Sequence, residues 1–187
     1  MAFLGQHTRR LVGLGGSMRD QSRSRAGLRA ALEMAQARGF EVELLDVREL
    51  NLPIYIPYLP IEQYPADAQP NIRRLMDTVR RADAMVWASP TYHGAVSGVF
   101  KNTIDYFEYL GDDTLPYLHG IPVGLMTCND PVTNASMVMM VAELKGWPAP
   151  TQITLGRVHF DEQLKLMDER IKRKMGQMID ELWEFKK

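Results

Sequence analysis

The 187-residue chain contains one cysteine, Cys128, and has no long hydrophobic run. A lone cysteine excludes an intramolecular disulfide, and a free thiol beside 12 methionines is typical of a reducing compartment. A membrane-spanning helix needs roughly 20 apolar residues. Thr8-Arg9-Arg10 resembles a twin-arginine export signal, but the apolar stretch behind it covers only residues 11–14. We therefore expect a cytoplasmic protein that does not enter a membrane.

The chain also lacks an excess of charge of either sign. Lys and Arg total 22 against 23 Asp and Glu, so the net charge is −1. Such a balance gives no field that would attract nucleic acid or an anionic membrane, and small-molecule chemistry is favoured instead. With 45% hydrophobic and 24% charged residues, the sequence is that of a globular protein. Its length suits a single domain over residues 1–187.

Short apolar segments alternate with helical patterns along the whole chain. Strands are predicted at residues 10–15, 40–45, 84–88, 121–126 and 151–155. Helices are predicted at residues 22–38, before residue 81, from about residue 97, at 132–145, and at 161–185. The last helix carries an apolar stripe of Leu164, Met167, Ile171, Met175, Met178 and Leu182. This alternation predicts an α/β fold with a five-stranded parallel sheet covered on both faces.

The loop after the first predicted strand, residues 15–24, is suited to a phosphate group. Its glycines allow a sharp turn, and the following helix start directs backbone N–H groups at one place. Hydroxyls of Ser17, Ser22 and Ser24 add neutral donors, and Arg19 adds a charged one. The alternative is that these serines only cap the helix.

Other ligand loops do not match this segment. A dinucleotide fingerprint needs a third glycine where the chain has Met18. A Walker loop needs a final Gly-Lys-Ser/Thr, which is absent, and a hydrolase elbow needs glycine where the chain has Arg19. A phosphate monoester is the remaining prediction.

A second candidate loop, residues 89–98, follows the third predicted strand. Pro90 stiffens the exit from the strand, and Gly94 and Gly98 permit the close approach of a flat ring. Tyr92 can stack on such a ring, and His93 can donate or accept a hydrogen bond at its edge. Taken alone, such a pair in a loop is more often part of an ordinary surface. Because ligands of open parallel sheets bind at the carboxyl ends of the strands, the two loops are expected to meet.

Together the two loops resemble the NADPH-dependent FMN reductase family, which belongs to the flavodoxin-like flavoproteins. Residues 16–22, Gly-Ser-Met-Arg-Asp-Gln-Ser, are similar to that family's G-S-x-R-x-x-S loop. Residues 89–105 are similar to its longer block beginning [ST]-P-x-Y and ending K-N-x-[IL]-D. The resemblance implies a three-layer sandwich with strand order 2-1-3-4-5 and one bound FMN.

The resemblance also implies which residues contact FMN. Its phosphate would be held by Ser17, Met18, Arg19, Ser22 and Ser24. The isoalloxazine ring would be lined by Pro90, Thr91, Tyr92, His93 and Gly94, with Thr127, Cys128 and Asn129 from the loop after the fourth strand. This chain departs from the family in two places: His93 replaces a frequent asparagine, and residues 127–134 contain no glycine. No side chain is expected to be catalytic, Cys128 included.

The implied activity is an oxidoreductase that takes electrons from NADPH or NADH through FMN to a small acceptor, which is free flavin, a quinone or an azo compound. The alternatives are a flavodoxin-type electron carrier and a flavin-binding regulatory protein. A homodimer or homotetramer is also expected. Residues 51–65 carry three tyrosines and four prolines without helical or strand periodicity, which is typical of an interface or of a loop folded over its own sheet. Phe107, Tyr109 and Leu110 are candidates for the same interface.

Overall fold

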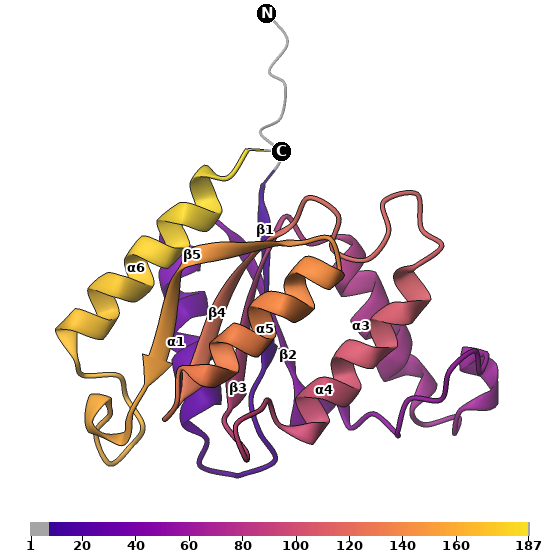
Figure 1. The fold of residues 1–187 in the computed structure, drawn as a ribbon, viewed down its shortest axis with the longest axis horizontal. Coiled ribbons are helices and arrows are strands. Elements are labelled where there is room, and N and C mark those ends of the chain that lie inside the picture. The colour runs from indigo at the N-terminus through magenta and orange to yellow at the C-terminus, as the bar shows by residue number, and fades with distance from the viewer. Residues whose placement is uncertain (1–7, 187) are drawn as a thin grey trace, which may run out of the picture.

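Five parallel strands form the centre of the protein in the computed structural model, which describes residues 8–186. They are β1 (Arg10–Gly15), β2 (Glu41–Asp46), β3 (Ala84–Pro90), β4 (Pro122–Cys128) and β5 (Trp147–Leu155). The order across the sheet is β2-β1-β3-β4-β5 (Figure 1). The predicted flavodoxin-like sheet and its order are therefore confirmed.

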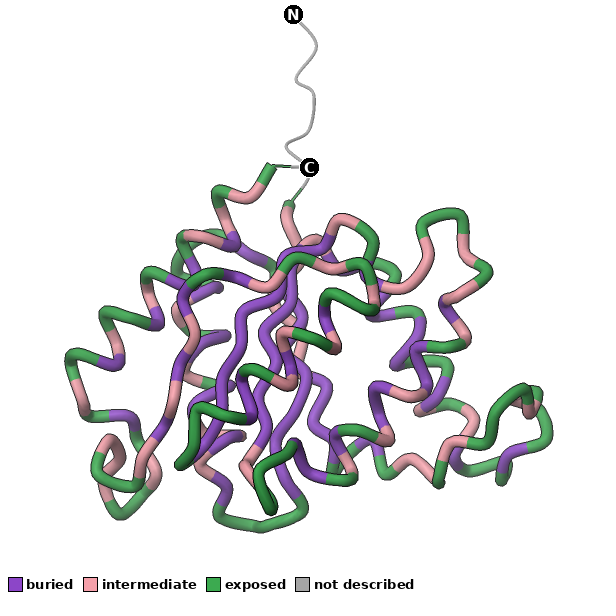
Figure 2. Tube along the Cα trace, viewed as in Figure 1, coloured by how far each residue is buried: buried purple, intermediate pink, exposed green. Residues whose placement is uncertain are grey.

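Helices cover both faces of this sheet (Figure 1). One face packs against α1 (Arg23–Arg38) and α6 (Glu169–Glu184). The other packs against α3 (Gln69–Arg80), α4 (Gly98–Asp105) and α5 (Val132–Glu143), with the short helix α2 (Val47–Leu50) beside them. Alternate residues of β3 serve the two faces: Met85 and Trp87 join the second core, Val86 and Ala88 the first. The strands are the most deeply buried part of the chain (Figure 2).

The fifth strand starts four residues earlier than predicted, at Trp147 rather than at Thr151. Pro148 and Pro150 made this segment look unlike a strand, since proline cannot donate to a sheet ladder. The prolines are tolerated because β5 lies at the edge of the sheet and pairs only with β4.

The prediction of one helix over residues 161–185 is wrong at its start. Helix α6 begins at Glu169, where the Asp168 carboxylate caps it by accepting from the N–H groups of Arg170 and Ile171. These bonds lower the pKa of Asp168. Upstream, Leu164 has a φ of +61° and the Asp161 side chain closes a turn, so Leu164 and Met167 lie in a loop. The rest of the predicted stripe is buried, namely Ile171, Met175, Met178 and Leu182.

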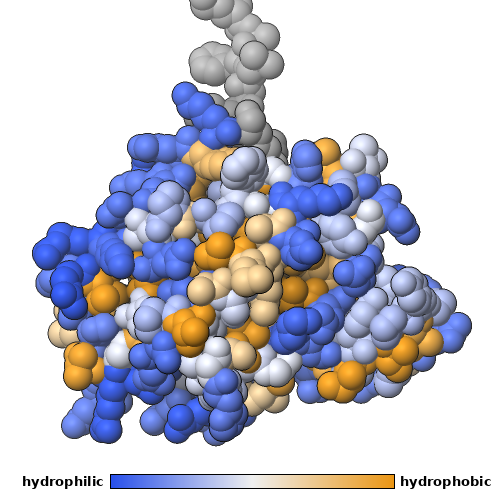
Figure 3. All heavy atoms as spheres, viewed as in Figure 1, coloured by the Kyte–Doolittle hydropathy of each residue, from blue (hydrophilic) through white to orange (hydrophobic). Residues whose placement is uncertain are grey.

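The segment 51–65 is divided between the core and the surface. Tyr64 is buried, the Asn102 side chain donates to the Pro53 carbonyl at 2.8 Å, and the Tyr109 hydroxyl donates to the Leu59 carbonyl. Its outer side chains remain exposed, with Tyr58 97% and Ile54 76% accessible. Hydrophobic surface is visible on this protruding segment at the lower right of Figure 3.

The expectation that Phe107 and Leu110 reach a subunit interface is wrong. Both are buried in the protein's own core, in the 3-10 helix η2 (Tyr106–Leu110) that follows α4. Phe107 packs edge-on against Trp87 of β3, with ring centroids 6.3 Å apart. The two side chains therefore pack against the sheet of their own chain.

No helix within residues 8–186 is long and apolar enough to cross a membrane.

Candidate functional site

The loops after β1, β3 and β4 meet at one edge of the sheet, the lower edge in Figure 1. A cleft of about 60 Å³ lies between them. It is lined by Ser17, Arg19, Gln21, Ser22, Arg23, Ser24, Pro90, Thr91, Tyr92, Cys128 and Asn129. The two candidate loops found in the sequence are thus brought together, as expected for the carboxyl edge of a parallel sheet.

Two glycines make the first loop possible. Gly15 has a φ of +145° and Gly16 a φ of +101°, values that other residues rarely adopt. The chain leaves β1 directly across β3: the Gly16 N–H donates to the Ala88 carbonyl at 3.0 Å, and a Cβ at Gly15 would lie 1.9 Å from that oxygen. The loop is therefore fixed against the sheet at its first residues.

The three serines of this loop are buried and bonded to the loop itself. Ser22 caps α1 by accepting from the Arg25 N–H, and its hydroxyl lies 2.9 Å from that of Ser24. Ser17 accepts from the Arg19 N–H at 3.2 Å. The capping role considered for Ser22 is thus confirmed. Helix capping gives no role to the exposed Arg19 guanidinium, because that group takes no part in the cap.

Residues Tyr92 to Ala95 form a tight turn at the end of β3. Tyr92 and Ala95 exchange backbone hydrogen bonds of 2.9 and 3.1 Å, and both residues between them have positive φ: His93 +53° and Gly94 +80°. Positive φ at both central residues is typical of a type I′ two-residue turn. His93 and Gly94 are consequently at an exposed tip and do not line the cleft, whereas Tyr92 does.

Three threonine hydroxyls join the second loop to the third. The Thr91 hydroxyl lies 3.0 Å from that of Thr127 in β4 and 2.8 Å from that of Thr133 in α5. Thr127 and Thr133 are fully buried. Thr127 therefore supports the wall of the cleft from behind and does not line it. Because both hydroxyls contact Thr91, they fix the path of the chain beyond Pro90.

The third loop contributes Cys128 and Asn129. Asn129 has a φ of +75° and donates its N–H to the Leu155 carbonyl at 2.8 Å, which ties the end of β4 to β5. The buried Cys128 thiol has its pKa raised to about 11 because burial disfavours the thiolate. Since the thiolate is the reactive form, Cys128 is expected to be inert.

This inertness gives a direct prediction. At pH 7.5 the native protein should leave Cys128 unmodified by iodoacetamide over a period in which the protein in denaturant is fully modified. Mass spectrometry of both samples measures the difference. Rapid labelling of the native protein would show that the thiol is exposed or ionised.

The structure distinguishes among the predicted contact residues. Met18 projects into solvent, and with His93, Gly94 and Thr127 it is absent from the cleft lining. Sequence reasoning missed Gln21 and Arg23, although both lie between the predicted serines. Arg23 is the first residue of α1 and Gln21 directly precedes the N-cap Ser22, so their place at the helix start was the available signal, since backbone N–H groups at such a start favour an anion.

The sequence is similar to those of several known proteins. The sequence model of a family described as NADPH-dependent FMN reductase matches residues 9–159. The chain is 31% identical over 97 residues to an NAD(P)H-dependent FMN reductase of Pseudomonas aeruginosa, a match that covers 52% of this chain and 49% of that protein. It is 24% identical over 180 residues to an FMN-dependent NADPH-azoreductase of Staphylococcus aureus, with 91% of each chain covered.

The fold also occurs among solved structures. The flavoenzyme NAD(P)H:(acceptor) oxidoreductase FerB of Paracoccus denitrificans superposes with a TM-score of 0.72 at 18% identity, covering 95% of this chain and 97% of FerB. At that identity the likeness establishes the fold alone. The chain spans about half the length of the P. aeruginosa relative that it matches.

Proposed function

Because the chain belongs to the NADPH-dependent FMN reductase family, we propose that it binds one FMN by its phosphate at the cleft and oxidises NADPH or NADH. The electrons pass to a small acceptor. We further propose that residues 1–187 act as a single domain in the cytoplasm.

The donor set of the cleft carries this proposal. Its lining includes the guanidinium groups of Arg19 and Arg23 and three serine hydroxyls, but no carboxylate. This combination fits a phosphate dianion, which needs charged and neutral donors together. A volume of about 60 Å³ is far below the roughly 300–1,000 Å³ of whole-ligand pockets. The cleft therefore suits the phosphate end of FMN, and the ring would lie on the surface outside it.

The loop after β3 provides that surface. Tyr92 is partly exposed beside the cleft, and a Cβ added to Gly94 or Gly98 would meet no protein atom within 4 Å. A flat ring can therefore approach the backbone closely there, with backbone N–H groups at its edge. FMN, when bound, supplies the hydride chemistry between nicotinamide and acceptor. The protein's own task is to hold the ring and leave one face accessible.

The acceptor is free flavin, a quinone or an azo compound. The names of two relatives, FMN reductase and azoreductase, support free flavin and azo compounds. Steady-state oxidation of NADPH and of NADH, measured with FMN-loaded protein and each acceptor class, tests the proposal. Turnover with at least one acceptor is expected. Reduction by neither nucleotide would contradict the reductase and favour the flavodoxin-type carrier.

Arg19 gives a second test of the phosphate site. Arg19→Ala removes an exposed guanidinium from the cleft and is expected to weaken FMN binding about tenfold, since a charge-assisted hydrogen bond contributes roughly 1.5–3 kcal/mol. The midpoint of thermal unfolding without FMN should stay unchanged because, within residues 8–186, the exposed Arg19 side chain makes no hydrogen bond or ion pair. Fluorescence titration with FMN measures the affinity. Wild-type affinity in the variant would make Arg19 an ordinary surface charge.

We propose that the protein assembles as a homodimer or homotetramer through the exposed part of residues 51–65. Ile54, Ile56 and Tyr58 expose apolar surface on a segment stiffened by proline, which loses little entropy on association. Light scattering at micromolar concentration should give two or four times 21.3 kDa. Tyr58→Asp should shift the mass toward the monomer. A wild-type protein of 21.3 kDa with full reductase activity would contradict the assembly.

A further inference from the structure

A buried ion pair lies behind the phosphate loop, outside the cleft. The Arg25 Nε in α1 is 2.8 Å from the Asp46 carboxylate at the end of β2, whose side chain is 1% exposed. The sequence alone does not indicate this contact, because 20 residues lie between Arg25 and Asp46. A buried carboxylate requires a partner of opposite charge, so Asp46 fixes the position of the guanidinium.

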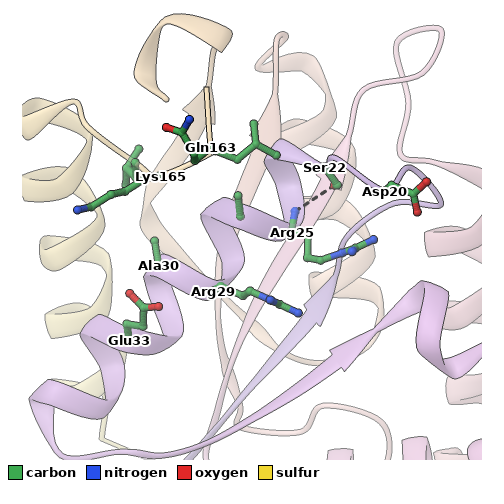
Figure 4. Close-up of a pocket in the computed structure, with 11 residues that line it drawn as sticks. Asp20, Ser22, Arg25, Arg29, Ala30, Glu33, Gln163 and Lys165 are labelled. Carbon is green, nitrogen blue, oxygen red and sulfur yellow. Dashed lines mark hydrogen bonds between the residues drawn. The ribbon is translucent and has the colours of Figure 1, made fainter. Parts of the chain in front are cut away.

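The same guanidinium holds the backbone of the loop. Its Nη2 donates to the Ser17 carbonyl at 3.2 Å and to the Arg19 carbonyl at 3.0 Å. Figure 4 shows the Arg25 side chain reaching from α1 toward the loop that carries Asp20, while Arg29 follows one turn later. One planar group thus connects α1, β2 and two peptides of the loop.

The direction of these two carbonyls determines where the loop's donors point. In a trans peptide, the C=O of one residue and the N–H of the next point in opposite directions. Because the Ser17 and Arg19 carbonyls face Arg25, the N–H groups of Met18 and Asp20 face away from it. Within the described residues the Met18 N–H has no hydrogen-bond partner.

Asp46 restricts the loop at a second point. Its Oδ1 accepts from the Arg48 N–H at 3.0 Å, which caps α2, and a Cβ at Gly16 would lie 3.2 Å from this oxygen. The Arg48 guanidinium in turn pairs with Asp20 and lowers the pKa of its carboxyl. The loop is therefore held to α2 through Asp20 and passes close to the end of β2 at Gly16.

From this arrangement we propose that Arg25, held by Asp46, is a positioning residue for the phosphate site: by holding the Ser17 and Arg19 carbonyls it fixes the loop whose Ser17 and Arg19 line the cleft. The proposal rests on the proposed FMN site. It differs from a general electrostatic role, because it depends on the fork geometry of arginine and not on its charge. Lysine keeps the charge but cannot reach the carboxylate and both carbonyls with one rigid group.

The first experiment uses protein without FMN and so does not depend on the proposed function. Arg25→Lys is compared with Arg29→Lys, the matched change one turn along α1 at an exposed position. Hydrogen exchange followed by mass spectrometry should show faster exchange of residues 16–20 in Arg25→Lys only, with the strands of the sheet unchanged. Equal exchange of this loop in wild type and in Arg25→Lys contradicts the proposal that Arg25 holds the loop.

The second experiment measures the consequence for binding. Arg25→Lys should weaken FMN at least tenfold while changing riboflavin less than twofold, because riboflavin lacks the phosphate. The double variant Arg25→Gln/Asp46→Asn avoids an unpaired buried charge and should behave in the same way. Wild-type FMN affinity in both variants, or an equal loss for FMN and riboflavin, overturns the positioning role. Failure of the wild-type protein to bind FMN would instead overturn the proposed function. The exchange result would still decide whether Arg25 holds the loop.

Discussion

FMN is expected to bind the protein ten- to hundredfold more tightly than riboflavin, which differs from it by the phosphate. At the proposed site this phosphate would meet Arg19, Arg23 and buried serine hydroxyls, and riboflavin would use none of the arginine charge. Losing hydrogen bonds to a charged group costs roughly 1.5–3 kcal/mol, which corresponds to this range of dissociation constants. Quenching of flavin fluorescence, titrated at fixed ionic strength, measures both ligands directly.

The discrimination should follow the charge of the cleft. In Arg19→Ala the ratio of FMN affinity to riboflavin affinity is expected to fall, because FMN affinity decreases while riboflavin affinity stays constant. Raising the salt concentration should likewise weaken FMN more than riboflavin, since a partly exposed charge pair is screened. Coincident titration curves for the two flavins in wild-type protein would refute the assignment of the first loop to the phosphate.

Gly15→Ala is expected to abolish folding or to leave a protein that binds no flavin. The added Cβ would lie 1.9 Å from the Ala88 carbonyl oxygen, which belongs to the neighbouring strand and cannot move aside. The φ of +145° adds strain for any residue with a side chain. A loss of at least about 4 kcal/mol follows, which is a large share of the roughly 5–15 kcal/mol by which an ordinary domain is stable against unfolding. Thermal unfolding monitored by circular dichroism measures it.

Gly98→Ala provides the matched control for this change. Gly98 is the first residue of α4, and a Cβ there would meet no protein atom within 4 Å. Alanine should therefore leave the stability unchanged or raise it by up to about 1 kcal/mol, because it restricts the unfolded chain. A Gly15→Ala protein as stable as Gly98→Ala would mean that the first loop does not cross β3 as described.

Local sequence patterns were sufficient where one segment carries the whole signal. The unbroken apolar run of β3 and the glycines before Ser17 each specify a local structure without help from distant residues. Sequence patterns gave wrong predictions where tertiary packing decided which side chains are buried and where a helix begins. Phe107 and Leu110 have the spacing of an amphipathic surface, but whether that surface meets the sheet or another subunit depends on contacts that periodicity does not encode. Asp168, not the apolar stripe, set the start of α6.

By itself the sequence determined the order of strands and helices along the chain, the meeting of the two candidate loops at one sheet edge, and the donor groups that those loops would offer to a phosphate. These follow from rules of chain direction and local backbone preference. Only the tertiary structure decided which groups support the site from behind: the Arg25–Asp46 pair, and the hydroxyls of Thr91, Thr127 and Thr133. The physical reason is that such bonds join residues far apart in the chain, and their existence depends on side-chain distances that arise only when the strands are side by side.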